Sequence, residues 1–237
     1  MTSRYFRQFP PIIFVLLCSA ATGELNLSEY AKAYPDSMDP FTGNWAGQWV
    51  GTDQDDPEIS AQVYGLGEGR YRMTFKHRLD VRCPILHVVD QAAEGGVLAF
   101  RNEYYFGRFE DDRFVGGEVA EGKRFEMRKV EVLSPTLGEK APRGAVRLFD
   151  SKNKELWRDT RGWYVTDWGT LVVSPGSADL LTRDRYRDVQ LHLEFRLPYR
   201  PAMRGQDRGN SGVHLQSAYE VQILDSFGLE GVYNECG

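Results

Sequence analysis

Side chains capable of acid–base chemistry alternate with apolar ones along three predicted strands between residues 190 and 225. They are His192 and Glu194 in the first strand, His214 and Gln216 in the second, and Glu220, Gln222 and Asp225 in and after the third. Because alternate residues of a strand share a face, pairing of the three strands would put these groups on one surface of one sheet. Carboxylates move protons at carbon and at glycosidic oxygen, so the pattern predicts a sugar site. An ordinary solvated sheet face remains the more common meaning of such alternation.

A long loop separates the first two of these strands. Residues 200–212 (RPAMRGQDRGNSG) mix arginines, amides and glycines, and long loops between strands often carry function. The loop does not have the sequence of a phosphate-binding loop, because no Lys-Ser/Thr pair ends it and no helix follows. We therefore hold two interpretations open, a ligand-binding loop and a solubilising hairpin loop.

The elements that must position these groups are predicted to be almost entirely β. Residues 43–132 contain eight short runs with period-2 character, separated by glycine- and aspartate-rich turns. These runs are 45–51, 61–67, 70–76, 85–89, 96–101, 104–110, 113–119 and 124–132. The spacing is typical of a small antiparallel barrel or sandwich. A lead-in (24–42) precedes this segment, and a linker rich in proline and glycine (133–145) follows it.

A second β segment covers residues 146–237, beginning with a predicted strand at 146–150. Its 92 residues supply about half the strands of a large sandwich, so we expect the sequence to be truncated. Within residues 190–197, Leu191, Leu193, Phe195 and Leu197 are predicted to face one way and the polar residues the other.

Aromatic residues could either stack on sugars or fill the β core. Trp45 and Trp49, together with Tyr104, Tyr105 and Phe106, give the first segment its aromatic character. Aromatic side chains dominate small β cores, so burial is the favoured interpretation for them. The same holds for Trp157, Trp163 and Trp168.

The N-terminal sequence has the features of an export signal. Arg4 and Arg7 precede a short apolar run at residues 12–18, and small residues follow at 19–22. We expect a signal peptide at residues 1–23 and a periplasmic or extracellular location. Lipid anchoring through Cys18 is disfavoured, because Leu17 stands where a small residue is needed. A buried strand is disfavoured too, since no pairing partner is evident nearby.

Composition excludes several classes of protein. A hydrophobic fraction of 41% argues against a disordered chain. With 29 basic against 34 acidic residues, the net charge of −5 argues against nucleic acid and anionic membrane surfaces as partners, and no transmembrane segment is expected in the exported chain. Cys83 and Cys236 could pair or stay free, and no Cys/His spacing typical of zinc occurs.

Residues 144–237 resemble the bacterial 3-keto-disaccharide hydrolase family, formerly a domain of unknown function. The resemblance rests on GAVRLFD, GTLVV, DVQLHLEFRLP, RGNSGVHLQSAYEVQILDSFG and NECG, in this order. It implies a concanavalin A-like jelly roll and a hydrolase or lyase acting on glycosides oxidised at C3 of the sugar. The front segment resembles a small β domain that precedes this module in some members.

The resemblance also implies roles for individual residues. Acid–base catalysis would fall to Glu194, Glu220 and Asp225, and substrate binding to Arg208, Asn210, His214, Gln216, Gln222 and Glu235. A divalent metal, held by Asp225 or Glu220, or an arginine would stabilise an enolate. The oxidised sugar is the expected partner. The alternatives are a non-catalytic carbohydrate-binding sandwich and an inactive fragment.

Overall fold

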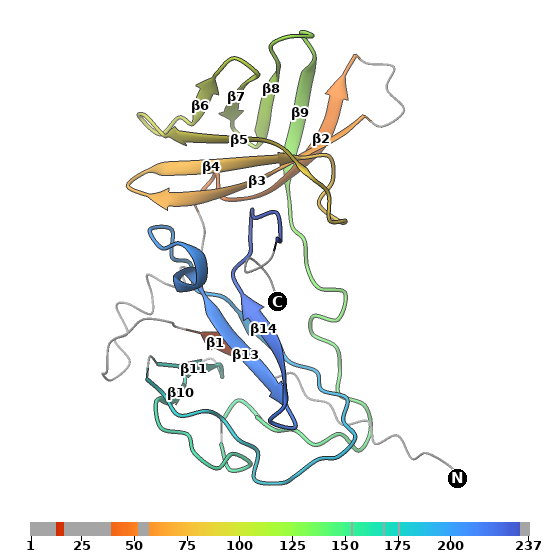
Figure 1. The fold of residues 1–237 in the computed structure, drawn as a ribbon, viewed down its shortest axis with the longest axis vertical. Coiled ribbons are helices and arrows are strands. Elements are labelled where there is room, and N and C mark those ends of the chain that lie inside the picture. The colour runs from red at the N-terminus through yellow and green to blue at the C-terminus, as the bar shows by residue number, and fades with distance from the viewer. Residues whose placement is uncertain are drawn as a thin grey trace.

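A computed structural model describes residues 13–16, 39–51, 57–152, 154–167, 169–174 and 176–232. It contains two β-rich parts, a front domain (residues 39–130) and a back domain (residues 146–232), joined by an extended linker that runs along one side (Figure 1). The prediction of an all-β fold is confirmed, because the described chain has one helical turn, the 3₁₀ segment Gly205–Arg208.

The front domain is a single antiparallel sheet of eight strands, in the order β5-β4-β3-β2-β9-β8-β7-β6. The strands are β2 (Gly43–Val50), β3 (Glu58–Gly67), β4 (Arg70–Lys76), β5 (Ile85–Ala92), β6 (Ala99–Arg101), β7 (Tyr105–Glu110), β8 (Arg113–Glu118) and β9 (Arg124–Val130). Each of the eight predicted runs overlaps one strand. The sheet curls into a nearly closed barrel, as Figure 1 shows.

Aromatic side chains fill this barrel, as the sequence predicts. Trp45 is 2% exposed and packs edge-on against Phe109 with ring centroids 5.0 Å apart. Trp49 and Tyr105 are partly buried against the same core. Tyr104 is 55% exposed, so the expectation of burial is wrong for that residue. It precedes β7 directly, where the chain is still turning.

The back domain carries two smaller sheets. A four-stranded sheet has the order β10-β11-β1-β12, formed by Trp163–Val165, Leu171–Val173, Ile13–Leu16 and Glu194–Arg196. A separate hairpin pairs β13 (Asn210–Leu215) with β14 (Tyr219–Leu224). Phe149, Trp157 and Leu171 form a small core, in agreement with the predicted burial of Trp157. Trp163 is partly buried against that core, and Trp168 lies outside the described residues.

Two expectations about strands in this part are wrong. Residues 146–150 are described and form no strand. Ile13–Leu16, for which no partner was expected, pairs in parallel with both β11 and β12. An apolar run of this kind can join any open sheet edge, and the partners lie far away in the sequence. The signal peptide stays a prediction.

The expected three-stranded sheet across residues 190–225 does not form. In the described chain β12 pairs with β1, whereas β13 pairs with β14 alone. The segment between β12 and β13 explains the difference, because it runs to the front domain: Arg204 donates to the carbonyl of Leu66 at 3.0 Å, and Tyr199 donates to Asp39 at 3.2 Å. The hairpin is thereby moved away from β12.

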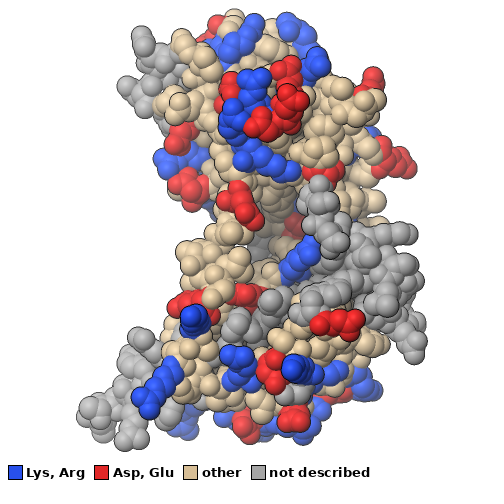
Figure 2. Space-filling view, turned by 180° about the vertical axis from the view of Figure 1, so that it is seen from behind, with Lys and Arg blue, Asp and Glu red and all other residues tan. Residues whose placement is uncertain are grey.

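The front domain also holds the chain that follows β14. The buried hydroxyl of Thr74 donates to the carbonyl of Gly228 at 3.0 Å, and Lys76 donates to that of Leu229 at 3.1 Å. In Figure 1 strands β3 and β4 cross above the end of the hairpin where β14 finishes. The space-filling view narrows between the two domains and shows acidic and basic residues interspersed on the surface (Figure 2).

Two further findings concern membrane-spanning helices and the cysteines. No helix in the described ranges is long and apolar enough to cross a membrane. Cys83 is a free thiol, and its predicted alternative partner Cys236 lies outside the described residues, as does Cys18.

Candidate functional site

Four of the predicted site residues share one face of the β13–β14 hairpin. The register pairs His214 with Glu220, Gly212 with Gln222, and Asn210 with Leu224, so their side chains project from the same side. Gln222 donates a hydrogen bond to the amide oxygen of Asn210, which fixes both amides. We call this set, consisting of Asn210, His214, Glu220 and Gln222, the polar face.

Glu220 and His214 lie opposite each other on the polar face. His214 Nε2 lies 3.9 Å from Glu220 Oε2, and the two side chains are 62% and 43% exposed. Gly212 makes room for the carboxylate, because a Cβ there would lie 1.9 Å from Glu220 Oε1. A carboxylate reachable from solvent and beside an imidazole can accept a proton from a bound ligand.

Arg208 and Asp225 close the other end of the hairpin. Arg208 donates from Nε and Nη2 to the two oxygens of Asp225 at 3.0 and 2.7 Å, and the side chains are only 9% and 14% exposed. Asp225 Oδ1 also accepts the amide of Phe227 at 3.1 Å. The carboxylate of Asp225 is therefore held in place by three hydrogen bonds with little exposure to solvent, which suits a positioning role better than proton transfer.

Glu194 is held by its own surroundings. Its Oε1 atom lies 3.2 Å from His192 Nε2 and accepts a hydrogen bond from the linker amide of Gly138. The side chains of His192 and Glu194 are 10% and 13% exposed, while Phe195 is 45% exposed. The polar side chains of His192 and Glu194 are thus the more buried ones, because β12 turns them toward the linker, while Phe195 is exposed.

The remaining predicted residues fall outside the polar face. Gln216 lies in the β13–β14 turn with a φ of 54°, and its amide donates to the carbonyl of Arg187 at 2.6 Å. Glu235 lies outside the described residues. The structure therefore brings four of the nine predicted site residues together on the hairpin and two more, Arg208 and Asp225, at its end.

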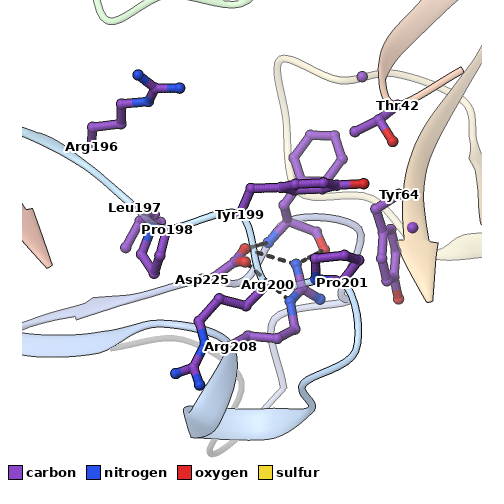
Figure 3. Close-up of a pocket in the computed structure, with 13 residues that line it drawn as sticks. Thr42, Tyr64, Arg196, Leu197, Pro198, Tyr199, Arg200, Pro201, Arg208 and Asp225 are labelled. Atoms are coloured by element: carbon purple, nitrogen blue, oxygen red, sulfur yellow. Dashed lines mark hydrogen bonds and ion pairs between the residues drawn. The ribbon is translucent and has the colours of Figure 1, made fainter. Parts of the chain in front are cut away.

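A cavity of about 310 Å³ lies where that end of the hairpin meets the front domain (Figure 3). The front domain contributes Thr42, Gly43, Tyr64 and Gly65, and the back domain contributes residues 196–201, Arg208, Asp225 and Phe227. Arg208 stacks on Tyr64, with its Cζ atom 4.7 Å from the ring centroid. In Figure 3 Tyr199 extends toward Thr42 and Tyr64, and the side chain of Arg196 points away from this group.

Tyrosines near the cavity are kept neutral. Burial, and to a smaller extent the charge of Asp39, raises the pKa of Tyr199, although a hydrogen bond with Thr42 opposes the shift. Burial together with Asp39 and Tyr199 raises the pKa of Tyr71 to about 12. Tyr199 thus acts as a hydrogen-bond donor to Asp39 rather than as a base.

The implied divalent metal does not fit the described residues. No group of three or more His, Cys, Asp and Glu side chains comes together in the described ranges. Glu220 and His214 supply two donors, and Asp225 is occupied by Arg208. Hard divalent cations take six or more oxygen ligands, so these side chains do not form a metal site by themselves.

The sequence did not point to the cavity. Tyr64 and Thr42 belong to the front domain, and Tyr199 and Phe227 flank the predicted strands. The local signals were the long loop at residues 200–212, which contains Arg208 and follows Tyr199, and the predicted site residue Asp225, all of which line the cavity. The loop contacts the front domain, because Arg204 donates to the carbonyl of Leu66. Neither interpretation of the loop, as a ligand-binding loop or as a solubilising loop, included this contact.

Comparison with known protein families gives a match for the back domain. Residues 144–237 match the family model of the 3-keto-alpha-glucoside-1,2-lyase-like domain, which confirms the resemblance found in the sequence. The match includes the whole hairpin, Arg208 and Asp225, and none of the front domain. No curated protein and no solved structure matches the chain.

Proposed function

We propose that the chain is an exported enzyme module that cleaves 3-keto-glycosides, with the polar face of the hairpin as its reaction surface. The observation that carries the proposal is the Glu220–His214 pair, which lies within the segment matched by the lyase-like family model. The apolar run and small residues at the N-terminus support export.

The chemistry follows from the ketone at C3 of the sugar. The ketone acidifies the hydrogen on C2, so a base can remove that proton and leave the electron pair as an enolate. Glu220 is the proposed base, because it is the carboxylate that neither Arg208 nor the linker holds. Its location beside His214 lets the imidazolium form of His214 compensate the negative charge that develops on the oxygen.

Collapse of the enolate completes the cleavage. The electron pair forms the C1–C2 double bond, the C1–O bond breaks, and the leaving oxygen takes a proton from an acid, for which His214 is the nearest candidate. Water then adds across the double bond, which gives net hydrolysis. Asn210 and Gln222 are fixed by their mutual hydrogen bond and offer their remaining donors and acceptors to sugar hydroxyls.

The test is turnover of methyl 3-keto-α-glucopyranoside by the purified chain and by two matched variants. Glu220→Gln should lower kcat about 10²–10⁴-fold, the range for removal of a general base. Glu194→Gln, the same change on the carboxylate that holds the linker, should lower kcat less than tenfold.

Each other outcome has a clear meaning. Ligand binding without turnover in any form would make the module a carbohydrate-binding sandwich. Equal loss in both variants would remove the special role of Glu220.

A further inference from the structure

The cavity between the two domains combines aromatic rings with a few fixed polar groups. Its walls combine rings, from Tyr64, Tyr199 and Phe227, with a fixed ion pair between Arg208 and Asp225. Flat apolar surface together with a few convergent polar groups is typical of small-molecule sites, and such sites occur preferentially at domain interfaces. A volume of about 310 Å³ lies at the lower end of their range.

Arg208 and Asp225 keep hydrogen-bonding capacity after pairing with each other. Arg208 uses Nε for Asp225 Oδ2, and Nη2 for Asp225 Oδ1 and the carbonyl of Phe227. Its Nη1 group makes no hydrogen bond with the described part of the chain. Asp225 Oδ2 accepts one bond there and has a further lone pair. The cavity therefore offers one donor group and one acceptor to the hydroxyls of a ligand.

The front domain holds this arrangement in place. Tyr64 covers one face of the Arg208 guanidinium, and Tyr64 itself packs edge-on against Phe227 with centroids 6.3 Å apart. Gly65 lies against Tyr199 so closely that a Cβ would come within 2.6 Å of the hydroxyl. The back domain alone would leave Arg208 exposed and the cavity without one wall.

We propose that the cavity between the domains binds a neutral pyranose ring, and that the front domain therefore forms part of the substrate site. The ring would lie against Tyr199 and bond through its hydroxyls to Arg208 and Asp225. The proposal rests on the proposed function for its choice of a sugar. It extends that function by assigning to the front domain, which the family model does not cover, a direct role in binding.

The position of the cavity suits a non-reacting part of a longer glycoside. Glu220 lies in β14, and Asp225 directly follows that strand, five residues further along the chain. At the rise per residue of a β-strand, the two residues are about 17 Å apart. The ring in the cavity is therefore a different one from the ring that loses its proton at Glu220. Binding in the cavity should affect KM for extended substrates and leave kcat unchanged.

The experiment measures binding of maltotriose, methyl α-glucopyranoside and methyl α-glucuronide by isothermal titration to the Glu220→Gln chain. That background prevents turnover, so binding is measured even if no substrate is cleaved. Adding Tyr199→Leu, which keeps apolar bulk but removes the flat ring, should weaken maltotriose binding at least fivefold. Adding Arg208→Lys, which keeps the charge but loses the two-point fork, should do the same.

The matched control is Tyr104→Leu, because Tyr104 is 55% exposed on the front domain and lies outside the cavity lining. It should leave the affinity within twofold. Unchanged affinity in a folded Tyr199→Leu variant, or no binding of any neutral sugar, would overturn the proposal. A more than tenfold preference for the glucuronide would overturn it as well, in favour of an anion site at the arginines.

The two proposals fail separately. If the chain binds sugar in a way that depends on Tyr199 but shows no turnover, the sugar-binding role of the cavity stands and the proposed enzymatic activity is wrong. If turnover depends on Glu220 but is unchanged by substitution of Tyr199 or Arg208, the enzymatic activity stands and the sugar-binding role of the cavity is wrong. If Tyr199→Leu does not fold, Arg208→Lys decides the outcome alone.

Discussion

Arg208 and Asp225, seventeen residues apart, form a two-point ion pair that joins the start of β13 to the end of β14 next to the front domain. Breaking such a nearly buried pair by removing one partner leaves an uncompensated charge. The pair therefore fixes the end of the hairpin and also limits which substitutions the cavity tolerates.

Removal of one partner of the Arg208–Asp225 pair should lower the stability of the folded chain. We expect Arg208→Ala to lower the free energy of unfolding by about 3–5 kcal/mol, because Asp225 would stay buried without its cation. Urea unfolding followed by tryptophan fluorescence measures the change. Arg72→Ala is the control, since Arg72 forms the same two-point pair with Asp90 at 38% and 30% exposure and should cost at most about 1 kcal/mol. Equal losses would contradict the importance of burial.

A methyl group at Gly212 should disturb catalysis more than stability. Gly212→Ala places a Cβ where the Glu220 carboxylate now lies, so that side chain must swing away from His214. Because Glu220 is flexible and 43% exposed, the thermal midpoint should change by less than about 2 °C. The kcat for the 3-keto-glycoside should fall at least tenfold. Full activity would show that the present Glu220 position is not the reactive one.

The contact between the domains should be sensitive to Gly228. This residue has a φ of 75°, and a Cβ there would lie 2.2 Å from Tyr64 Cε1. Gly228→Ala adds a steric clash to the cost of the left-handed backbone, and overpacking of this kind costs about 1–3 kcal/mol. Gly122→Ala, with a φ of 67° and open space around it, isolates the backbone cost alone. Denaturant unfolding of both variants gives the difference, and a difference near zero would contradict close packing at Tyr64.

The front domain should lose stability in mild acid through His87. Burial lowers the pKa of this imidazole, which stacks on Tyr105 and lies 3.0 Å from the amide nitrogen of Asn102. The unfolded chain then binds the proton more readily, so stability is complete above pH ~6.5 and declines as the pH falls through the lowered pKa. Thermal midpoints between pH 5 and 8 should show the decline, and His87→Gln should reduce it. His77→Gln, at an exposed position, should leave it unchanged.

The front domain could be predicted strand by strand because its pairing is local. Alternation and turn glycines such as Gly69 and Gly122 define each hairpin, and consecutive strands mostly pair with each other. The polar face of β13–β14 was predictable for the same reason. The partner of β12 was not, since Ile13–Leu16 comes from the far end of the sequence. Alternation along one strand carries no information about which distant segment lies beside it.

The cavity was beyond prediction for a related reason. Tyr64 and Arg208 are in contact because the loop after β12 runs to the front domain. The sequence around each residue contains no pattern that predicts this contact. Arg208 and Asp225 were named as site residues from the resemblance, but their mutual pairing and their burial required the fold.

The bonds from Thr74 and Lys76 to the carbonyls after β14 have an evolutionary consequence. A back domain transplanted onto a different partner would lose the anchors of its last hairpin. Chains that carry this back domain without the front barrel should therefore hold the segment around Gly228 by other contacts.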